Sequence, residues 1–491
     1  MRIMMVSSEA VPFAKTGGLA DVASGLSNAL AEAGNEVVLV MPCYRRFISE
    51  EKRGSVVGEV RIDFPSTTIE ATIYETRLPG DLVKVLLVDC PSFFDRAGLY
   101  VEGGSDYADN AERFLFFSRA AVELARTLFI PDVIHANDWQ TGLIPALVLQ
   151  SREQGGPLQD VATVMTIHNM AFQGQFPSWQ MMNTGIHPRF FNWRQLEFWG
   201  HLNLLKAGIA MADQVTTVSP TYAKEICRPE FGYGLDPVLE YRGDDLVGIL
   251  NGVDMTVWNP EIDPHLDTQY TADTVEEGKA RCKAALQREV GLPEKPEAML
   301  FGMISRLTDQ KGLDLITLKA GQFLGANVQL VVLGTGEERH ENYLRGLQES
   351  HPEKVAAIIG FDDALAHRIE AGADAYLMPS QFEPCGLNQQ YSLIYGTPPI
   401  VNAVGGLADS VVDTNSQTLA NGTANGFQFH HYHGDAFLDT VWRAVGLYQH
   451  FHDDWRKIVD HGMRKDSSWS GSARNYIDVY ERAKDRVRSE P

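Results

Sequence analysis

Two cationic side chains, Arg306 and Lys311, lie five residues apart, directly after an apolar run that ends at Ile304. An arginine can hold phosphate oxygens through two donors, whereas a lysine supplies a mobile point charge. This spacing at a strand-to-helix loop suits a clamp for a diphosphate. A solvated basic loop would have the same composition.

A carboxylate occupies a similar position later in the chain. Glu383 follows a predicted strand over 375–378 and stands before Pro384, and Gly386 follows at the start of a predicted helix. A fixed carboxylate followed by backbone donors suits a sugar, whose hydroxyls need a fixed acceptor and several donors. A structural turn with a helix-start charge is the alternative. Cys385 has no neighbouring base, so we expect it to pack and not to act as a nucleophile.

The string Gly-Gly-Leu-Ala-Asp occurs twice, at 17–21 and at 405–409. A glycine pair at a helix N-terminus lets backbone N–H groups approach a phosphate closely. Lys15 adds a positive charge to the first copy. The repeat suggests two half-sites built alike, although a tight turn used twice for packing would look the same.

Further polar residues follow predicted strands in the first half of the chain. Glu9, Lys15 and Asp21 follow one strand, Asp138 follows a second, and His168 and Asn169 follow a third. A single histidine at a strand end is often a satisfied core residue. Because several polar groups gather at neighbouring strand ends, we expect a polar binding surface there.

Strand-like apolar runs alternate with amphipathic helical stretches, which is typical of parallel sheets covered by helices. The predicted strands are 3–6, 36–41, 83–89, 132–135, 162–168 and 214–218, and then 299–304, 328–333, 355–359, 375–378 and 399–401. The pattern starts afresh after a boundary near 248–255. We therefore predict an α/β protein with two Rossmann-like, doubly wound domains that face a deep interdomain cleft, where the carboxyl ends of the strands bind ligands.

Composition limits the partners. A chain of 491 residues exceeds what one core usually supports, and its formal charge of −22 repels nucleic acid and anionic lipid. No run approaches the roughly 20 apolar residues of a membrane span, and the N-terminus lacks the pattern of a signal peptide. The five cysteines are scattered, without the spacing of a metal site or a disulfide framework. We expect a cytoplasmic protein that binds neither nucleic acid nor membranes.

Several motifs together resemble, in order and along almost the whole chain, those of bacterial glycogen synthases and plant starch synthases. They are Lys15-Thr16-Gly17-Gly18-Leu19, His135-Ala136-Asn137-Asp138-Trp139, His168-Asn169, Leu250-Asn251-Gly252-Val253-Asp254, Ser305-Arg306-Leu307, Gln310-Lys311-Gly312, Phe382-Glu383-Pro384-Cys385-Gly386-Leu387 and Gly405-Gly406-Leu407. The resemblance implies a retaining glycosyltransferase of GT-B type that uses ADP-glucose to extend an α-1,4-glucan such as glycogen or a starch-like primer. It implies an acceptor-side domain over 1–250, a donor-side domain over 251–471, and a helix within 472–491 that packs back on the first domain. We expect no cofactor and no metal ion.

The same resemblance assigns roles position by position. Glu383, Arg306, Lys311 and His168 match catalytic positions. The donor site would be formed by Lys15, Gly17, Gly18, Asn251, Phe361, Cys385, Gly386, Leu387 and Asn388. The sugar and acceptor side would be formed by Glu9, Asp21, Asp138 and Asn169.

Two positions depart from the pattern of related enzymes. Phe361 stands where bacterial members often carry a tyrosine that stacks on adenine, so stacking is retained without the hydroxyl. Tyr391 stands eight positions after Glu383, where the wider set of transferases has a second glutamate. A UDP-glucose-dependent transferase, a phosphorylase with pyridoxal phosphate and an inactive glucan-binding scaffold are the alternatives.

Overall fold

The computed structural model describes residues 1–489, and the chain divides into two compact units. Unit 1 contains Met1–Gly252 together with the C-terminal segment from Trp469, and unit 2 contains Val253–Ser468. The sequence placed the boundaries at 250/251 and 471/472. The chain therefore passes between the units twice.

A nine-stranded sheet forms the centre of unit 1, in the order β14-β13-β9-β8-β1-β2-β5-β4-β3. Its parallel strands are β1 (Arg2–Val6), β2 (Glu36–Pro42), β5 (Lys84–Asp89), β8 (Val133–Asn137), β9 (Ala162–Ile167), β13 (Gln214–Thr217) and β14 (Leu246–Gly248). In register, Met5 of β1 lies between Leu39 of β2 and His135 of β8. Apart from the edge strand β14, these strands are buried on both faces, which explains their continuous apolar runs.

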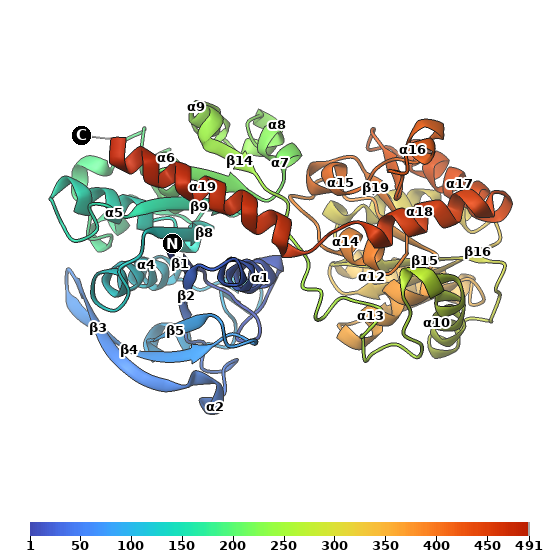
Figure 1. Cartoon of the computed structure of the whole chain (residues 1–491), viewed down its shortest axis with the longest axis horizontal. Coiled ribbons are helices and arrows are strands. Elements are labelled where there is room, and N and C mark those ends of the chain that lie inside the picture. The colour runs from blue at the N-terminus through green and yellow to red at the C-terminus, as the bar shows by residue number, and fades with distance from the viewer. Residues whose placement is uncertain (490–491) are drawn as a thin grey trace. The chain divides into compact units, whose positions relative to one another are not determined.

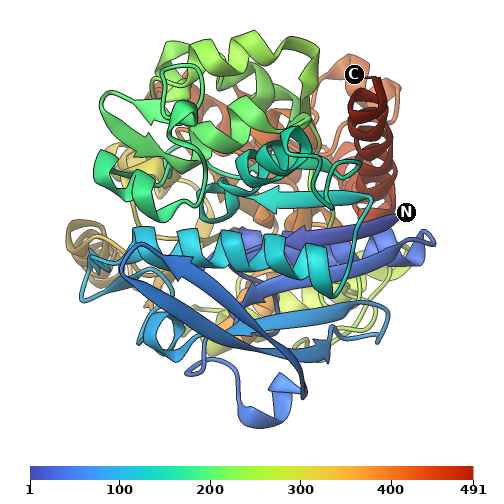
Figure 2. The ribbon, with the colours of Figure 1, turned by 90° about the vertical axis from the view of Figure 1, so that its left-hand side faces the viewer.

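The edge of this sheet carries an antiparallel hairpin that the sequence analysis missed. Strands β3 (Ser55–Phe64) and β4 (Thr67–Arg77) pair with each other, and β4 pairs antiparallel with β5. Figure 2 shows the long ribbon of β3 and β4 beside α4 (Asn110–Thr127), which contacts β3. Exposed residues outnumber buried ones in β3, and over its second half buried residues alternate with exposed polar ones. The hairpin therefore lacks the apolar run that marked the central strands.

Helices cover the sheet of unit 1. They are α1 (Gly18–Glu32), α2 (Glu50–Arg53), α3 (Pro91–Phe94), α4, α5 (Ile144–Glu153), α6 (Leu204–Met211), α7 (Pro220–Glu225), α8 (Pro229–Gly232) and α9 (Asp236–Arg242). Two small sheets lie outside the main sheet. One pairs β6 (Val101–Glu102) with β7 (Ser105–Asp106), and the other has β12 (His201–Asn203) between β10 (Gln175–Pro177) and β11 (Glu197–Phe198).

The C-terminal helix α19 (Trp469–Ser489) belongs to unit 1, where it contacts α1 and β9 (Figure 1). Trp469, Tyr476 and Tyr480 bury their rings against the unit. Gly25 of α1 leaves the space that the Trp469 indole fills, because a Cβ there would overlap the ring. The helix thus completes the core of a unit whose other residues all precede 253.

Unit 2 contains a six-stranded parallel sheet in the order β17-β16-β15-β18-β19-β20. Its strands are β15 (Met299–Ile304), β16 (Val328–Gly334), β17 (Val355–Ile359), β18 (Ala375–Met378), β19 (Pro399–Asn402) and β20 (Phe427–Phe429). Alternate residues face two cores: Phe301 and Leu330 join one cluster, and Leu300 and Val331 join the other. Both faces are therefore covered, as a doubly wound sheet requires.

The helices of unit 2 are α10 (Val275–Glu289), α11 (Leu313–Phe323), α12 (Glu338–Ser350), α13 (Asp363–Gly372), α14 (Asn388–Ile394), α15 (Gly405–Ser410), α16 (Ser416–Ala420), α17 (Gly434–His450) and α18 (His452–Arg464). The start of α14 and the loop before α11 both follow strands at the carboxyl end of the sheet. This edge holds the residues that the sequence singled out.

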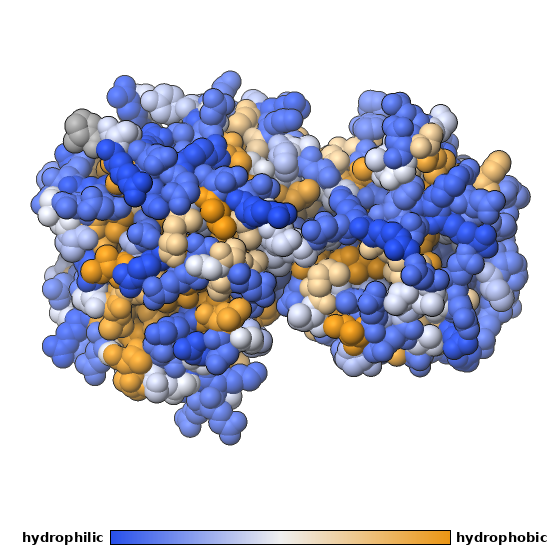
Figure 3. Space-filling model, viewed as in Figure 1, coloured by the Kyte–Doolittle hydropathy of each residue, from blue (hydrophilic) through white to orange (hydrophobic). Residues whose placement is uncertain are grey.

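On the face shown in Figure 3, hydrophilic residues predominate, and hydrophobic residues gather over strands β3 to β5 of unit 1. Within residues 1–489, no helix has both the length and the apolar character needed to cross a membrane. None of the five cysteines forms a disulfide.

Candidate active site

An ion pair lies at the carboxyl edge of the unit 2 sheet. Lys311 Nζ donates to Glu383 Oε2 at 2.5 Å, and Ser380 Oγ donates to the same oxygen at 3.1 Å. The two charged side chains are only 16% and 10% exposed. The structure therefore brings together the cation and the carboxylate that the sequence placed in separate loops.

Backbone contacts hold these two loops in contact. Gln381 N donates to Gln310 O at 2.8 Å, and Gln310 Nε2 donates to Phe382 O at 3.3 Å. Gly312 has φ +78° and lies so close to Pro379 that a Cβ would overlap its carbonyl oxygen. A glycine is needed at this position for both reasons. The backbone is therefore fixed at Gly312, and the side chain of the preceding residue, Lys311, reaches Glu383 from a defined position.

Asn388, predicted as a donor contact, bonds the ends of neighbouring elements in this structure. Its Nδ2 donates to Ile304 O at 2.9 Å and to the Tyr376 hydroxyl at 2.8 Å. These bonds tie the start of α14 to the ends of β15 and β18. Of its predicted neighbours, Cys385 is buried, while Gly386 (φ +71°) and Leu387 are partly exposed.

Arg306 and Phe361 are exposed at the same edge of unit 2. Arg306 follows β15, and its guanidinium has no hydrogen bond or ion pair within residues 1–489. Phe361 follows β17, and its ring is 89% exposed. An exposed cation and an exposed aromatic ring are available to a charged and a planar group respectively.

The two glycine pairs differ, which corrects the idea of two similar half-sites. Gly17 and Gly18 are exposed at the start of the fifteen-residue helix α1, and a Cβ on Gly17 would meet nothing within 4 Å. Gly405 (φ +44°) and Gly406 are buried, and a Cβ on either would overlap the backbone oxygen of Glu383 or Cys385. The second pair packs against the Glu383 loop, as the alternative explanation held.

In unit 1, the buried Glu9 holds the loop of the first glycine pair in place through hydrogen bonds. Its carboxylate accepts bonds from Thr16 N (2.5 Å), Thr16 Oγ1 (2.6 Å) and the Tyr100 hydroxyl (2.6 Å). Glu9 is only 3% exposed. We therefore assign it to positioning the loop, whereas the sequence had placed it among the residues that face a sugar.

Lys15 and Asp21 form an ion pair at 2.8 Å across the start of α1. The Lys15 side chain is 52% exposed and the Asp21 side chain 27%. An exposed pair of this kind contributes little to stability, so the lysine can turn toward an anion at low cost.

Asp138, His168 and Asn137 form a fixed network at the ends of β8 and β9. Asp138 Oδ1 accepts from His168 N at 2.7 Å, and His168 Nε2 lies 2.9 Å from Asn137 Oδ1. Asn137 Nδ2 donates to Val6 O at 3.1 Å, so its Oδ1 is the acceptor and the histidine carries its proton on Nε2. The other ring nitrogen, Nδ1, is left as an acceptor.

Burial shifts the pKa of several groups in this network. It lowers the pKa of His168 to about 3, so the ring is neutral at pH 7. It raises the pKa of Asp138 to about 7, against backbone hydrogen bonds from His168 and Asn169 that lower it. His135, which bonds Tyr480 and Thr166, has a pKa lowered to about 3 by burial and belongs to the core.

Two further predicted residues, Asn169 and Asn251, also lie in unit 1. Asn169 follows β9 and accepts a bond from Ala171 N at 3.0 Å. Asn251 lies just before the passage to unit 2 and is 5% exposed.

Known proteins resemble this chain over its full length. Residues 2–241 match the family described as starch synthase catalytic domain, and residues 284–441 match glycosyl transferases group 1. A glycogen synthase of Anaeromyxobacter dehalogenans is 47% identical over 98% of this chain and 99% of its own length. The chain belongs to the glycogen synthase family. A Rhodopirellula baltica glycogen synthase is 43% identical, with 98% of each chain covered.

Solved structures agree with this family membership. The catalytic domain of starch synthase IV from Arabidopsis thaliana matches with a TM-score of 0.89 and 32% identity, over 99% of each chain. A sucrose-phosphate synthase from Thermosynechococcus elongatus shares the fold alone, with a TM-score of 0.58 and 17% identity over 98% of each chain. The two units thus have the GT-B type fold, and the protein is a glycosyltransferase of the glycogen and starch synthase type.

Sequence reasoning missed the residues that position this glycogen synthase site. Thr16, Tyr100, Asn137, Ser380 and Tyr376 all bond a predicted site residue or orient one. Thr16, Asn137 and Ser380 lie within or beside the motifs, so their place next to strand ends was a usable signal. Tyr100 and Tyr376 carried none, because their contacts depend on tertiary packing.

Proposed function

We propose that this chain transfers glucose from ADP-glucose to the non-reducing end of an α-1,4-glucan, with retention at the anomeric carbon and release of ADP. The starch synthase IV structure holds ADP and acarbose, which supports a nucleotide-sugar donor and a glucan acceptor for this relative. The observation that carries the proposal is the buried Lys311–Glu383 pair beside the exposed Arg306.

The charges of this group suit the reaction. When the bond between the anomeric carbon and the diphosphate breaks, negative charge grows on the leaving group, and Arg306 and Lys311 supply preorganised positive charge. Positive charge grows on the sugar carbon, where Glu383 supplies a carboxylate. Ser380 and Lys311 hold that carboxylate in place before any substrate binds.

Retention follows when the acceptor attacks from the side of the leaving group. The acceptor 4-hydroxyl forms the new C–O bond, the old C–O bond breaks, and the hydroxyl proton passes to an oxygen of the departing diphosphate. No protein base is then required. The main-chain carbonyl near His168 offers a further dipole for the sugar, and the neutral His168 ring adds no competing positive charge.

Unit 1 carries further residues that suit these substrates. Lys15 and the exposed N-terminus of α1 suit donor phosphate, and Asp21, Asp138 and Asn169 suit sugar hydroxyls. The cations take the place that a divalent ion has in other transferases, so we propose a reaction without metal or cofactor. The absence of disulfides fits a reducing cytoplasm.

The test is incorporation of labelled glucose into a glycogen primer from ADP-glucose and, separately, from UDP-glucose, with Glu383→Gln beside the unmodified chain. We expect ADP-glucose to be the better donor. Glu383→Gln should lower the rate about 10²- to 10³-fold, as loss of a preorganised charge-stabilising group does. Equal rates for the unmodified chain and Glu383→Gln would refute the role of Glu383. A preference for UDP-glucose would refute the proposal that ADP-glucose is the donor.

A further inference from the structure

His265, Asp363 and His367 lie close together in unit 2, away from the Lys311–Glu383 pair in sequence. Their ligand atoms all lie within 4.8 Å of one another. Asp363 and His367 are four residues apart in α13 and therefore share one face of that helix. His265 comes from the loop before α10, and its ring centroid lies 4.9 Å from that of His367.

The surroundings of His367 orient it as a metal ligand. Its Nδ1 lies 2.7 Å from Oδ2 of the buried Asp263, which also accepts the Tyr395 hydroxyl at 2.5 Å. A carboxylate on one ring nitrogen fixes the tautomer and leaves the lone pair on Nε2, as in the outer shell of many zinc sites. Trp258 stacks on the ring at 3.8 Å, with an interplanar angle of 5°.

The other two ligands have no competing polar partner among the described residues. His265 and Asp363 are exposed, and neither side chain makes a hydrogen bond or ion pair within residues 1–489. Zinc–nitrogen bonds of about 2.0–2.1 Å put tetrahedral ligands roughly 3.4 Å apart. The exposed pair must therefore move inward while His367 stays fixed. Asp263 also accepts a bond from His265 N at 2.8 Å, so the carboxylate that contacts His367 of α13 also fixes the backbone of His265.

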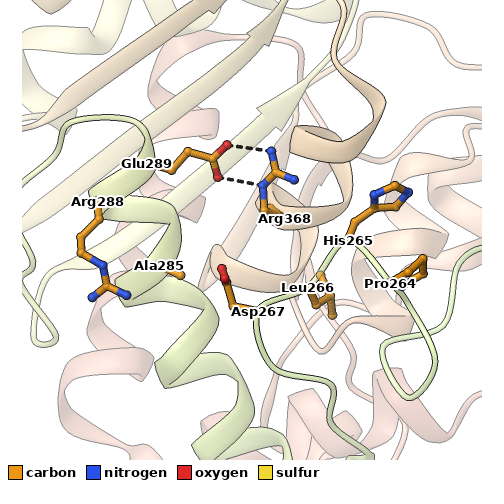
Figure 4. Close-up of a pocket in the computed structure, with 8 residues that line it drawn as sticks. All are labelled: Pro264, His265, Leu266, Asp267, Ala285, Arg288, Glu289 and Arg368. Carbon is orange, nitrogen blue, oxygen red and sulfur yellow. Dashed lines mark hydrogen bonds and ion pairs between the residues drawn. The ribbon is translucent and has the colours of Figure 1, made fainter.

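A pocket of about 460 Å³ lies beside this cluster, and of the three ligands His265 lines it. Pro264 and His265 lie on one side of it and Arg288 on the other (Figure 4). Arg368 is the nearest cation along α13, and it makes two bonds of 2.7 Å to Glu289, which balance its charge. Arg288 likewise bonds Glu294 at 3.0 Å, so both arginines of the pocket are paired with carboxylates.

A second cluster, Asp309, Glu337 and His340, is less suited to a metal. Arg339 pairs with both Asp309 and Glu337, and His340 already bonds Asp309 at 2.9 Å. Its ligand atoms are therefore occupied by a guanidinium and by one another.

We propose that His265, Asp363 and His367 bind a divalent transition ion of the zinc class, with water in the remaining position. Two imidazoles and a carboxylate suit Zn²⁺ and Co²⁺ better than Mg²⁺ or Ca²⁺, which prefer oxygen ligands. The ion joins the 263–265 loop to the start of α13.

Chelator-treated full-length protein, titrated with Zn²⁺ and analysed for bound metal, tests this site. We expect one ion per chain, a visible Co²⁺ spectrum of tetrahedral type, and a Tm about 5 to 10 °C higher at 100 times Kd. His265→Gln and Asp363→Asn, both at exposed positions, should each weaken Zn²⁺ binding at least tenfold.

The control is His430→Gln with His431→Gln, since this pair is exposed and lies in a histidine-rich stretch of the chain. Its affinity for Zn²⁺ should equal that of the unmodified protein. Binding of less than half an equivalent, unchanged affinity in the first two variants, or loss of the ion in the control would each overturn the proposal.

Discussion

Lys311 and Glu383 neutralise each other in a nearly buried setting. Removing one partner of such a pair leaves an uncompensated charge, which typically costs about 3 to 5 kcal/mol, although removing both costs less. We expect Lys311→Met to lower the free energy of unfolding of unit 2 by about 3 kcal/mol. The double variant Lys311→Met/Glu383→Gln should recover part of that loss.

Urea unfolding of the single and double variants measures this coupling. The matched control is the exposed pair Arg456–Glu276, where Arg456→Met should cost less than about 1 kcal/mol. If the double variant is less stable than Lys311→Met, the pair is not the source of the effect.

Asp138 should make the stability of unit 1 depend on pH. Its pKa of about 7 in the folded chain exceeds the 3.8 of an ordinary aspartate, so the folded state holds the proton more tightly. The contribution is complete below about pH 4 and is lost as pH rises through 7. Asp138→Asn keeps an acceptor for His168 N but cannot ionise. Its stability relative to the unmodified chain should therefore rise from pH 5 to pH 8.

Denaturant unfolding at both pH values checks this difference. Comparing the two chains cancels His135 and His168, whose depressed pKa values act in the opposite direction over pH 3 to 6.5. Asp21→Asn, at a partly exposed carboxylate, is the control and should show no such trend. A difference between Asp138→Asn and the parent that does not change with pH would contradict the shift.

The two identical Gly-Gly-Leu-Ala-Asp strings show that tertiary packing, and not local sequence alone, decides the role of a glycine. Gly405→Ala should destabilise unit 2 by about 2 kcal/mol or more, because φ is +44° and a Cβ would overlap Glu383 O. It should also displace Glu383 and slow transfer. Gly17→Ala, at the equivalent position with open space around it, should change the free energy of unfolding by less than about 1 kcal/mol. Thermal unfolding of both variants measures this difference. Equal losses of stability would show that the two strings share one role.

The strands of both sheet centres could be predicted from the sequence because each is buried on both faces. The runs at 299–304 and 375–378 coincide with β15 and β18. The hairpin β3–β4 could not, since its exposed polar residues carry no continuous apolar run. Most candidate site residues could be predicted because they directly follow strands. The pairing of Lys311 with Glu383 could not, because it arises only when β15 and β18 become neighbours.

The cluster of His265, Asp363 and His367 also could not be predicted from the sequence, because it depends on tertiary packing. His265 precedes the other two ligands by almost a hundred residues, and no sequence motif links it to them. Asp263, which orients His367, lies on the loop and not on α13. Of these three ligands, Asp363 and His367 alone lie at a short spacing in the sequence. The third ligand depends on how the loop before α10 packs on α13.

Unit 1 is completed by a helix that follows the whole of unit 2 in sequence. In α19, Tyr480 bonds the buried His135 at 2.8 Å, and Trp469 fills the space above Gly25. Loss of one such aromatic ring from a core typically costs about 3 to 5 kcal/mol, which is comparable to the stability of a whole domain. Unit 1 should therefore not fold without residues from 469 onward.

Scanning calorimetry of a chain that ends at Ser468 tests this dependence. Unit 2 retains its sheet, its cores and the bond from Val253 N to Ser467 O, so its transition should stay near that of the full chain. The transition of unit 1 should disappear. Tyr480→Ala in the full chain should lower the unit 1 transition alone, whereas Trp199→Ala, at a ring that is 82% exposed, should leave both unchanged. Two intact transitions in the shortened chain would mean that α19 covers unit 1 without stabilising it. The expected result would mean that unit 1 can form only after synthesis has passed through unit 2, because its last helix is made last.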